Sequence, residues 1–329
     1  MTIPLVRVRY MRDHARAYEQ LGGDAESLLR RIGTPPSVLD APEDLLPLCL
    51  LEVLTQHALR GTGFALGWTA APRTLLDLGS FGHRLSSAPS LLDAISMLPS
   101  AILSEISGAS IFLERRGEAL WICHGRFSGN ALLRTHAERF HAQMLLAIIR
   151  HWAGPEWTPD ELWLQTAPIP EDHAFWRIPR IRYGMPLLGL PLPGSLLHAP
   201  TVVVPALEPG LQDEPPLDHL DLVEATSRVL RTLLPSGDLT LEGLSKIMGM
   251  SVRSFQRRLS DAGTTHSRIM GEVRRTMAME RLARGSRSIS AIAQELGYSD
   301  SAHFHRAFRR WTGLGPRQFR SLRQSERAN

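Results

Sequence analysis

The 329-residue chain is long enough for two domains, and its 43% hydrophobic and 21% charged residues are typical of a globular protein with a buried core. The net charge of +4 is unevenly distributed. Residues 218–329 hold 19 Lys and Arg against 11 Asp and Glu, whereas residues 1–217 hold 18 against 22. This asymmetry indicates that only the basic C-terminal third meets a polyanion.

Composition also argues against several classes of protein. No long apolar run follows the N-terminus, so we expect no signal peptide, no membrane span and a cytoplasmic location. Cys49 and Cys123 both lie among apolar neighbours and form no Cys-x-x-Cys pair. We therefore expect two buried free thiols and no disulfide framework.

Helix and strand patterns are mixed through residues 1–205. Apolar spacing predicts helices at 11–32, 43–60, 90–103 and 130–152. Alternation predicts strands at 110–114 and 119–124, joined as a hairpin by residues 115–118, with further strands at 162–165 and near 181–183. Helices and a few strands around one core predict an α+β domain.

A proline-rich stretch is predicted to divide the chain. Residues 202–217 contain four prolines and a glycine, which interrupt any regular element, and we assign 206–217 as the linker. Residues 218–329 should then form a separate helical domain, and a fragment that begins near Pro216 is expected to fold alone.

No pattern in residues 1–205 predicts catalysis, a metal or a cofactor. The sequence contains no phosphate loop, dinucleotide fingerprint or nucleophile elbow. His136 and His141 lie about 140° apart around a predicted helix, unlike metal ligands spaced i, i+4. Cys123 and His124 are adjacent on a predicted strand and should face opposite sides of the sheet.

The last third contains two copies of one helix-turn-helix pattern, at residues 241–259 and 289–308. In each copy a helix with one apolar face ends at a glycine, Gly249 or Gly297, where a positive φ is favourable for glycine. Ser251 or Ser299 should then cap the next helix. An apolar stripe that ends at Gly285 predicts one long helix between the copies.

The second copy resembles a motif of a known family. The stretch 292–316, followed by Gln318-Phe319-Arg320, is similar to the second motif of AraC/XylS-type transcriptional regulators. The resemblance covers about residues 220–325 and implies an all-α DNA-binding domain with two helix-turn-helix motifs joined by a long helix.

Residues 1–205 resemble the arabinose-binding-like N-terminal domain found on one branch of that family. The features that carry this resemblance are the segment 82–94, the predicted hairpin and the helix opening Arg134-Thr-His-Ala-Glu-Arg139. The resemblance implies an effector-sensing or dimerisation domain and does not imply a sugar ligand.

The family pattern also implies which side chains meet DNA. The second helix of each motif should enter a major groove, the two grooves lying about 34 Å apart along one face of the duplex. Three residues of each helix should face the bases, and three further arginines should contact phosphates. The base-facing candidates are Arg253, Gln256, Arg257, Ser301, His305 and Arg306, and the phosphate candidates are Arg258, Arg309 and Arg310.

Together these features predict a transcriptional regulator and not an enzyme. The expected partners are double-stranded promoter DNA, a small organic effector of unidentified structure and binding residues, a second copy of the chain that dimerises through the N-terminal domain, and RNA polymerase if the regulator is an activator. An alternative stays open, in which the N-terminal domain is an oligomerisation or protein-partner surface with no ligand. A bifunctional alkyl-transfer repair regulator is disfavoured, because two isolated cysteines cannot supply the metal-bound cysteine set that it needs.

Overall fold

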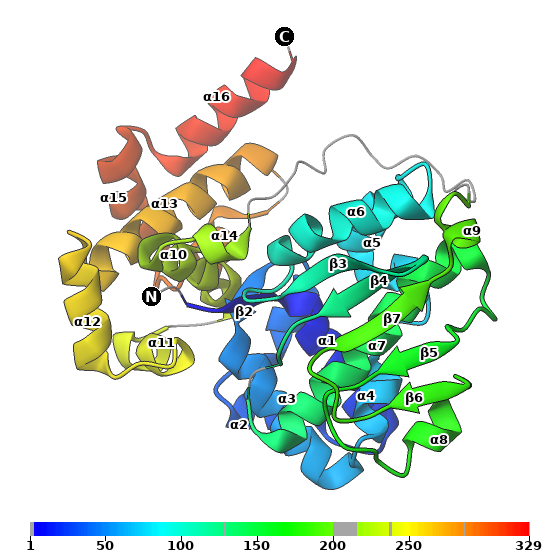
Figure 1. Cartoon of the computed structure of the whole chain (residues 1–329). Coiled ribbons are helices and arrows are strands. Elements are labelled where there is room, and N and C mark those ends of the chain that lie inside the picture. Colours follow the sequence, from blue (N-terminus) through cyan, green and yellow to red (C-terminus); the bar gives the residue numbers. More distant parts are fainter. Residues whose placement is uncertain (1–2, 128, 200–215, 237–238, 286, 329) are drawn as a thin grey trace. The chain divides into compact units, whose positions relative to one another are not determined.

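The computed structural model describes residues 3–127, 129–199, 216–236, 239–285 and 287–328 (Figure 1). The chain divides into two compact units. The sheet unit comprises Pro4–Leu28 and Leu51–His219, and the helical unit comprises Met1–Ile3, Leu29–Leu50 and Leu220–Asn329. The predicted fold class, a mixed α/β N-terminal region followed by a helical C-terminal region, is confirmed.

A five-stranded sheet of order β3-β4-β7-β5-β6 organises the sheet unit. Its strands are β3 (Ile111–Arg116), β4 (Ala119–His124), β5 (Glu161–Trp163), β6 (Arg180–Arg182) and β7 (Leu188–Leu192). Neighbouring strands are antiparallel except β5 and β6, which are parallel. The predicted hairpin of β3 and β4 is confirmed, and β3 extends to Arg116 because Gly117, at φ +60°, allows a two-residue turn.

Strand β7 is one that the sequence pattern did not predict, since glycine and proline both disfavour a strand interior. A Cβ at Gly189 would lie 3.1 Å from Cδ1 of Leu187 and 3.4 Å from the Trp121 ring, so the position is closely packed and favours a small residue. Pro191 pairs with Trp121 of β4 and lies beyond Gly189, the residue that pairs with Trp163 of β5. Its missing N–H therefore interrupts no pairing with β5.

Helices cover one face of this sheet. Aliphatic side chains of α6 (Leu91–Ala101) and α7 (Ala131–Ala153) share a buried core with Ile122 of β4 and Leu190 of β7. The other elements of the unit are β1 (Leu5–Arg7), α1 (Val8–Gln20), α3 (Leu48–Thr62), α4 (Ala65–Ala70), α5 (Gly79–Ser86), α8 (Asp172–Phe175), α9 (Gly194–Leu197) and 3₁₀ turns at Leu75–Leu78, Ile102–Ser104 and Leu217–His219.

Two predicted helices have different bounds in the structure. The helix predicted at 11–32 is divided into α1 and α2 (Ala25–Arg31), because Gly22 adopts a left-handed φ of +87°. The helix predicted at 43–60 begins only at Leu48, since Leu45–Pro47 form strand β2. Pro47 disfavours a helical conformation of the preceding residue and so keeps the segment extended.

The helical unit contains α10 (Leu222–Leu233) and six further helices, together with residues from the N-terminal part of the chain. The six are α11 (Leu241–Ile247), α12 (Val252–Asp261), α13 (His266–Arg284), α14 (Ile289–Glu295), α15 (Ser301–Thr312) and α16 (Pro316–Ala328), with 3₁₀ turns at Pro36–Asp40 and Leu234–Ser236. The Thr232 hydroxyl of α10 donates to the carbonyl of Leu45 at 2.9 Å. The thiol of Cys49 donates to the carbonyl of Ile247 at 3.3 Å.

These units do not follow the predicted limits of 1–205 and 218–329, because Leu29–Leu50 belong to the helical unit. The predicted linker, 206–217, lies outside the described residues except for Pro216 and Leu217. Asp218, just beyond it, accepts a hydrogen bond from the amide of Gly108 at 2.9 Å within the sheet unit. No helix among the described residues is both long enough and apolar enough to cross a bilayer.

The packing of residues 29–50 generates a prediction about the C-terminal fragment. A fragment of residues 216–329 should unfold at a lower temperature than the same unit in the full chain, and a synthetic peptide of residues 29–50 should raise its Tm. Leu45 and Leu46 are 2% and 0% exposed, and replacing a buried leucine by alanine costs about 2–5 kcal/mol. A peptide carrying Leu45→Ala and Leu46→Ala should therefore lose most of the effect, measured by circular dichroism.

The matched control is a peptide with Asp40→Ala, since Asp40 is exposed. A fragment as stable as the full chain's unit and unaffected by the peptide would contradict the prediction.

Candidate nucleic-acid interface

The first helix-turn-helix is formed by α11 and α12. Ser251 caps α12 by accepting a hydrogen bond from the amide of Ser254 at 3.2 Å, as predicted. Thr240 caps α11 in the same way, through the amide of Gly243 at 3.0 Å. Between the helices Gly249 adopts a φ of +68°, which confirms the predicted glycine turn.

The second helix-turn-helix, α14 and α15, has the same turn with one residue more. Gly297 has a φ of +72°. The prediction that Ser299 caps the following helix is wrong: the Asp300 carboxylate accepts from the amide of His303 at 2.7 Å. Helix α15 thus begins one residue further from its glycine than α12 does, which accounts for the register slip between the two copies.

Buried apolar side chains, among them Phe255 and Phe304, set the rotation of the second helix of each motif, and we call these helices, α12 and α15, the recognition helices. Phe255 and Phe304 are 0% exposed. The opposite side of α12 presents the predicted base-facing residues, and Arg253, Gln256 and Arg257 are all exposed. The amphipathic pattern of α12 is therefore arranged as the sequence predicted.

The correspondence between the recognition helices differs from the predicted one at one position. Counted from the buried phenylalanine, His305 matches Gln256 and the exposed Arg306 matches Arg257. Arg253, however, matches Ala302, whereas Ser301 matches Val252 and is the half-buried first residue of α15. The extra cap residue, Asp300, causes this offset.

The three predicted phosphate contacts have different surroundings. Arg309 and Arg310 are exposed in the last turn of α15. Arg258 is half-buried, and its Nη1 lies 3.8 Å from the sulfur of Met250, so this side chain lies against the turn of the first motif.

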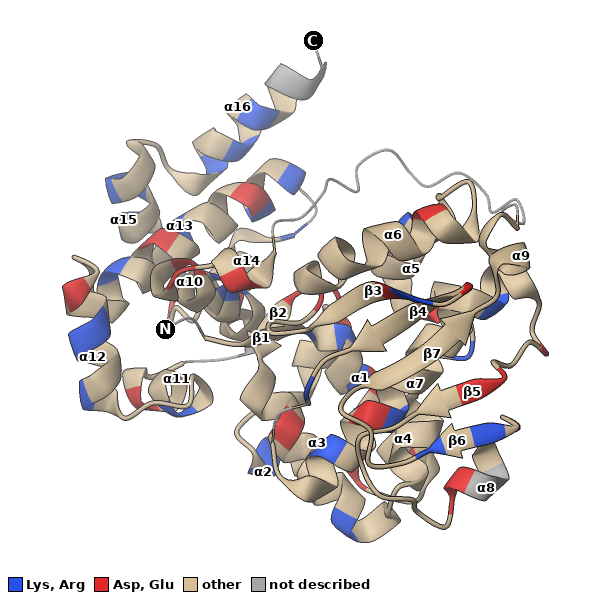
Figure 2. Cartoon of the chain, in the orientation of Figure 1, with Lys and Arg blue, Asp and Glu red and all other residues tan. Residues whose placement is uncertain are grey.

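Ion pairs divide the arginines of the helical unit into two groups. In the first group, Glu295 pairs with Arg281 at 3.2 Å and with Arg287 at 2.9 Å, and Glu280 pairs with Arg231 at 2.8 Å. The second group has no carboxylate within 4.0 Å among the described residues, and it includes Arg253, Arg257, Arg306, Arg309 and Arg310. Figure 2 shows basic residues along α12, α13, α15 and α16. The unpaired guanidiniums on the recognition helices are therefore free to bind an external anion.

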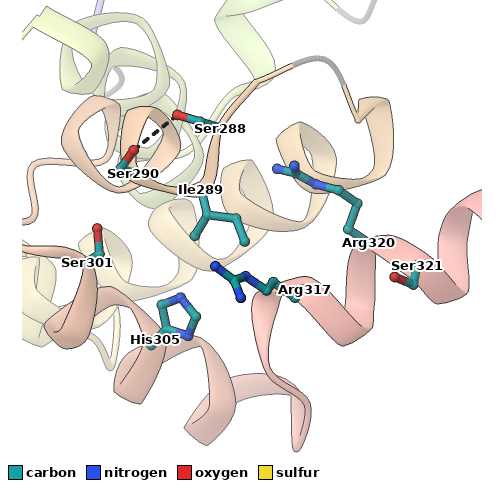
Figure 3. Close-up of a pocket in the computed structure, with 8 residues that line it drawn as sticks. All are labelled: Ser288, Ile289, Ser290, Ser301, His305, Arg317, Arg320 and Ser321. Atoms are coloured by element: carbon teal, nitrogen blue, oxygen red, sulfur yellow. Dashed lines mark hydrogen bonds between the residues drawn. The ribbon is translucent and has the colours of Figure 1, made fainter.

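A hollow of about 590 Å³ lies beside α15 (Figure 3). Ser301 and His305 line one side of it, and Arg317, Arg320 and Ser321 of α16 line another. Figure 3 shows the Arg317 guanidinium directed toward His305. Hydroxyl, imidazole and guanidinium donors on one hollow are suited to holding a phosphate.

The arginines of α16 were not predicted, because they lie outside the repeated pattern. Phe319 fixes this helix, since its ring packs edge-on against Phe308 with 5.4 Å between centroids. Arg320 donates to the carbonyl of Arg287 at 2.7 Å, and its Nε is buried with no hydrogen-bond partner among the described residues. The signal in the sequence was the pair Arg317 and Arg320, one turn apart and on either side of the apolar Phe319, directly after the second motif.

The cysteines do not form a reactive site. Cys123 is buried, and burial raises the pKa of its thiol to about 11, so the thiol stays protonated at neutral pH. Cys49 was predicted to be buried, but this is wrong: it is half-buried, since it lies at the edge of the helical unit where its thiol reaches the carbonyl of Ile247.

Histidines gather in the core of the sheet unit, an arrangement that the sequence did not predict. The Nε2 atoms of His14 on α1 and His136 on α7 lie 2.8 Å apart. The rings of His124 on β4 and His141 on α7 have centroids 4.9 Å apart. No group of three or more His, Cys, Asp or Glu residues in the described part of the chain has a metal-binding arrangement. His14 and His141 each also bond to a main-chain carbonyl, whereas Nδ1 of His136 and Nε2 of His124 are buried with no hydrogen-bond partner among the described residues.

Two family models match the chain. The arabinose-binding domain of AraC transcription regulators matches residues 22–201, and a helix-turn-helix domain matches residues 244–321. Because the first match covers more than half of the chain, the chain belongs to the AraC family of DNA-binding transcriptional regulators. This confirms the predicted family, and with it the prediction that the chain is a transcriptional regulator and not an enzyme.

Individual curated relatives match about a third of the chain. The ornithine utilization regulator of Pseudomonas aeruginosa is 38% identical over 112 residues, 33% of this chain and 33% of that protein. The HTH-type transcriptional regulator VirS of Mycobacterium tuberculosis is 36% identical over 100 residues, 30% of this chain and 29% of that protein. The chain thus spans about a third of the length of these curated relatives.

Solved structures give weaker likenesses. The transcriptional regulator CdpR from Pseudomonas aeruginosa is 20% identical with a TM-score of 0.39, covering 93% of this chain and 97% of that one. An AraC-type regulator from Chromobacterium violaceum is 25% identical with a TM-score of 0.28, covering 30% of this chain and 88% of that one.

The buried histidines predict sensitivity to acid. Burial lowers the pKa of His14 to about 4 and that of His141 to about 3, and it also lowers the pKa of His136. In the unfolded chain these groups take up protons near pH 6.5, whereas the folded chain keeps them neutral. Stability present above pH 6.5 should therefore be lost as pH falls from about 6.5 toward 4, by about 1.4 kcal/mol per pH unit for each such histidine.

Urea unfolding of the sheet unit at pH 7 and pH 5 measures this loss. The His14→Phe variant should have a shallower pH dependence, whereas His198→Phe, at an exposed residue directly after α9, should leave it unchanged. Equal stability at both pH values would contradict the prediction.

Proposed function

We propose that the chain is a sequence-specific transcriptional regulator that reads two successive major grooves of promoter DNA with α12 and α15. The observation that carries this proposal is the presence, within one compact unit, of two recognition helices that each present unpaired guanidiniums. Helix α13 joins the two motifs with 19 residues. At 1.5 Å per residue it is about 28 Å long, close to the 34 Å that separates successive major grooves on one face of DNA.

Direct base contacts are assigned by the donor pattern of each side chain. Arg253, Arg257 and Arg306 suit guanine, which presents two acceptors in the major groove, and Gln256 suits adenine. His305 and Ser301 complete the base-facing set in α15. Since the two helices differ in sequence, one subunit reads an asymmetric site.

Phosphate contacts hold the recognition helices in register. Arg309 and Arg310, at the end of α15, and Arg258 take this role in the proposal. The hollow lined by Arg317 and Arg320 supports a further phosphate contact beside the second recognition helix.

Control by a small organic effector is assigned to the sheet unit, together with homodimerisation. As an activator the protein would also contact RNA polymerase. The alternative, an N-terminal region that serves only as an oligomerisation or protein-partner surface, has one specific observation in its favour. Phe112 is 37% exposed on β3, an edge strand of the sheet, and an exposed edge with apolar side chains is suited to pairing with another chain.

Salt dependence tests the DNA-binding part of the proposal. The full chain should bind a duplex selected from a random pool, and its affinity should fall by about a thousandfold or more between roughly 50 and 200 mM salt if six or more phosphates are neutralised. Fluorescence anisotropy of the labelled duplex measures it. An affinity that is flat over this range would refute binding through the basic surface.

Single substitutions separate base contacts from phosphate contacts. Arg257→Ala and Arg306→Ala should each cost about 1–3 kcal/mol on the selected site and relax its preference at one base pair. Arg310→Ala should weaken all duplexes equally. Arg268→Ala is the matched control, since Arg268 is exposed on α13 and already pairs with Glu272 at 3.4 Å.

The measurement is anisotropy with the selected duplex and with its single-base variants. If Arg257→Ala and Arg306→Ala lower affinity evenly across all of these duplexes, the assignment of base contacts is refuted.

A further inference from the structure

A second hollow of about 590 Å³ lies in the sheet unit. It is formed where the loop after β4, the first turns of α7, the loop after β5 and the loop between β6 and β7 come together. These four segments contribute, among others, Arg126, Phe127, Arg134, Gln165, Thr166 and Met185. Its volume falls within the roughly 300–1,000 Å³ typical of sites for small molecules.

A buried ionic network fixes one wall of this hollow. Glu138 of α7, which is 0% exposed, accepts from the amides of Gln165 and Thr166 and from the Thr166 hydroxyl. Arg139, 2% exposed, donates to both oxygens of Asp172 at 2.9 and 2.7 Å and to the Thr166 hydroxyl at 2.6 Å. Residues 165 and 166 are therefore held in place before any ligand arrives, as a preformed site requires.

An aromatic side chain gives the hollow an apolar side. The Phe127 ring stacks on the buried imidazole of His124, with 4.2 Å between centroids and 5° between planes. Ala131, Met185 and Pro186 extend this apolar surface. The side chain of Gln165, which donates to the carbonyl of Gly125 at 2.9 Å, ties the loop after β4 to the loop after β5.

The charged side chains that line the hollow are all positive among the described residues. Arg126 and Arg134 are both exposed, and neither has a carboxylate within 4.0 Å among the described residues. No aspartate or glutamate is among the described residues that line the hollow. The nearby carboxylates of Glu138 and Asp172 are already occupied by the network described above. Two guanidiniums on a small, partly apolar hollow are suited to a ligand that combines an anionic group with an apolar body.

We infer that this hollow binds a small organic anion, a carboxylate or phosphate ester with a compact apolar part, and that this ligand is the effector. The inference rests on the proposed function, because it identifies the site of the effector within that scheme. Arg126 and Arg134 bind the anionic group, and Phe127 and Met185 contact the apolar part. Because Arg134 lies in the first turns of α7, which packs against the sheet, a bound anion acts directly on the central helix of the unit.

The test uses the full chain and three probes of similar shape: benzoate, phenyl phosphate and the neutral benzamide. Thermal unfolding and isothermal titration calorimetry report binding. At least one of the two anions should raise the Tm, and the anion that binds better identifies the preferred headgroup. Benzamide at the same concentration should have no such effect.

Substitutions locate the site. Arg126→Gln and Arg134→Gln should each weaken anion binding by about tenfold or more, and together should abolish it. The ligand-free Tm should not change, since both side chains are exposed. Arg115→Gln is the matched control, because Arg115 is an exposed arginine on β3 that does not line the hollow. Failure of both anions to bind, or equal binding by the double variant, would overturn the assignment.

DNA affinity distinguishes failure of this inference from failure of the proposed function. The anion that binds should change the affinity of the wild-type chain for its selected duplex, and the double variant should bind that duplex with no response to the anion. Anion binding that leaves DNA affinity unchanged would overturn the effector role alone. Loss of selective DNA binding by the wild-type chain would refute the proposed function, whatever the anion does.

Discussion

The burial of equivalent phenylalanines, Phe255 of α12 and Phe304 of α15, is the constraint on which the interface depends. Successive residues of an α-helix lie about 100° apart, so a residue two positions from a buried one points to nearly the opposite side. Two positions after Phe255 and Phe304 stand Arg257 and Arg306, both exposed. Since each phenylalanine is fully buried, the helix cannot rotate without exposing a large apolar side chain, at a cost of about 1.5–3 kcal/mol. The apolar core therefore sets the direction of the polar groups that would read bases.

The helical unit is assembled from separate parts of the chain, and this affects how its stability should be understood. Residues 29–50 supply β2 and the first residues of α3, whose Cys49 reaches the carbonyl of Ile247 at the end of α11. The first helix-turn-helix thus has a partner from the N-terminal part of the sequence, whereas the second packs on α16, through Phe308 and Phe319. The segment Leu29–Leu50 begins within α2 and ends within α3, so each of these helices carries residues of both units.

Local patterns predicted the fold where short-range rules decide it. The two glycine turns, the Ser251 cap, the β3–β4 hairpin and α7 all follow from residues close together in sequence. Some errors concern local features, such as the helix break at Gly22 and the Asp300 cap, and the others arise where distant residues decide. Strand β7 contains Gly189, which packs closely against Leu187 and Trp121, and Leu29–Leu50 join the helical unit through contacts with α10 and α11. For the site, the exposed arginines of α12 and α15 were predictable from the repeat. The position of Arg317, the histidine cluster and the hollow of the sheet unit depend on tertiary packing that no motif encodes.

Arginine has three distinct settings in this chain, and the setting indicates the role. In the sheet unit, buried arginines neutralise buried acids: the Glu105 carboxylate lies 3.5–3.9 Å from Arg7, Arg9 and Arg84, and Arg139 binds Asp172. In the helical unit, Arg231, Arg281 and Arg287 pair with Glu280 or Glu295, so these positions add little net positive potential. A third group has no carboxylate within 4.0 Å among the described residues: Arg253 and Arg257 on α12, Arg306, Arg309 and Arg310 on α15, and Arg126 and Arg134 at the sheet-unit hollow. An external anion offsets the positive charge of these arginines, and the two places where they gather are therefore suited to anions of different size, a nucleic-acid backbone on the helical unit and a small organic acid in the sheet unit.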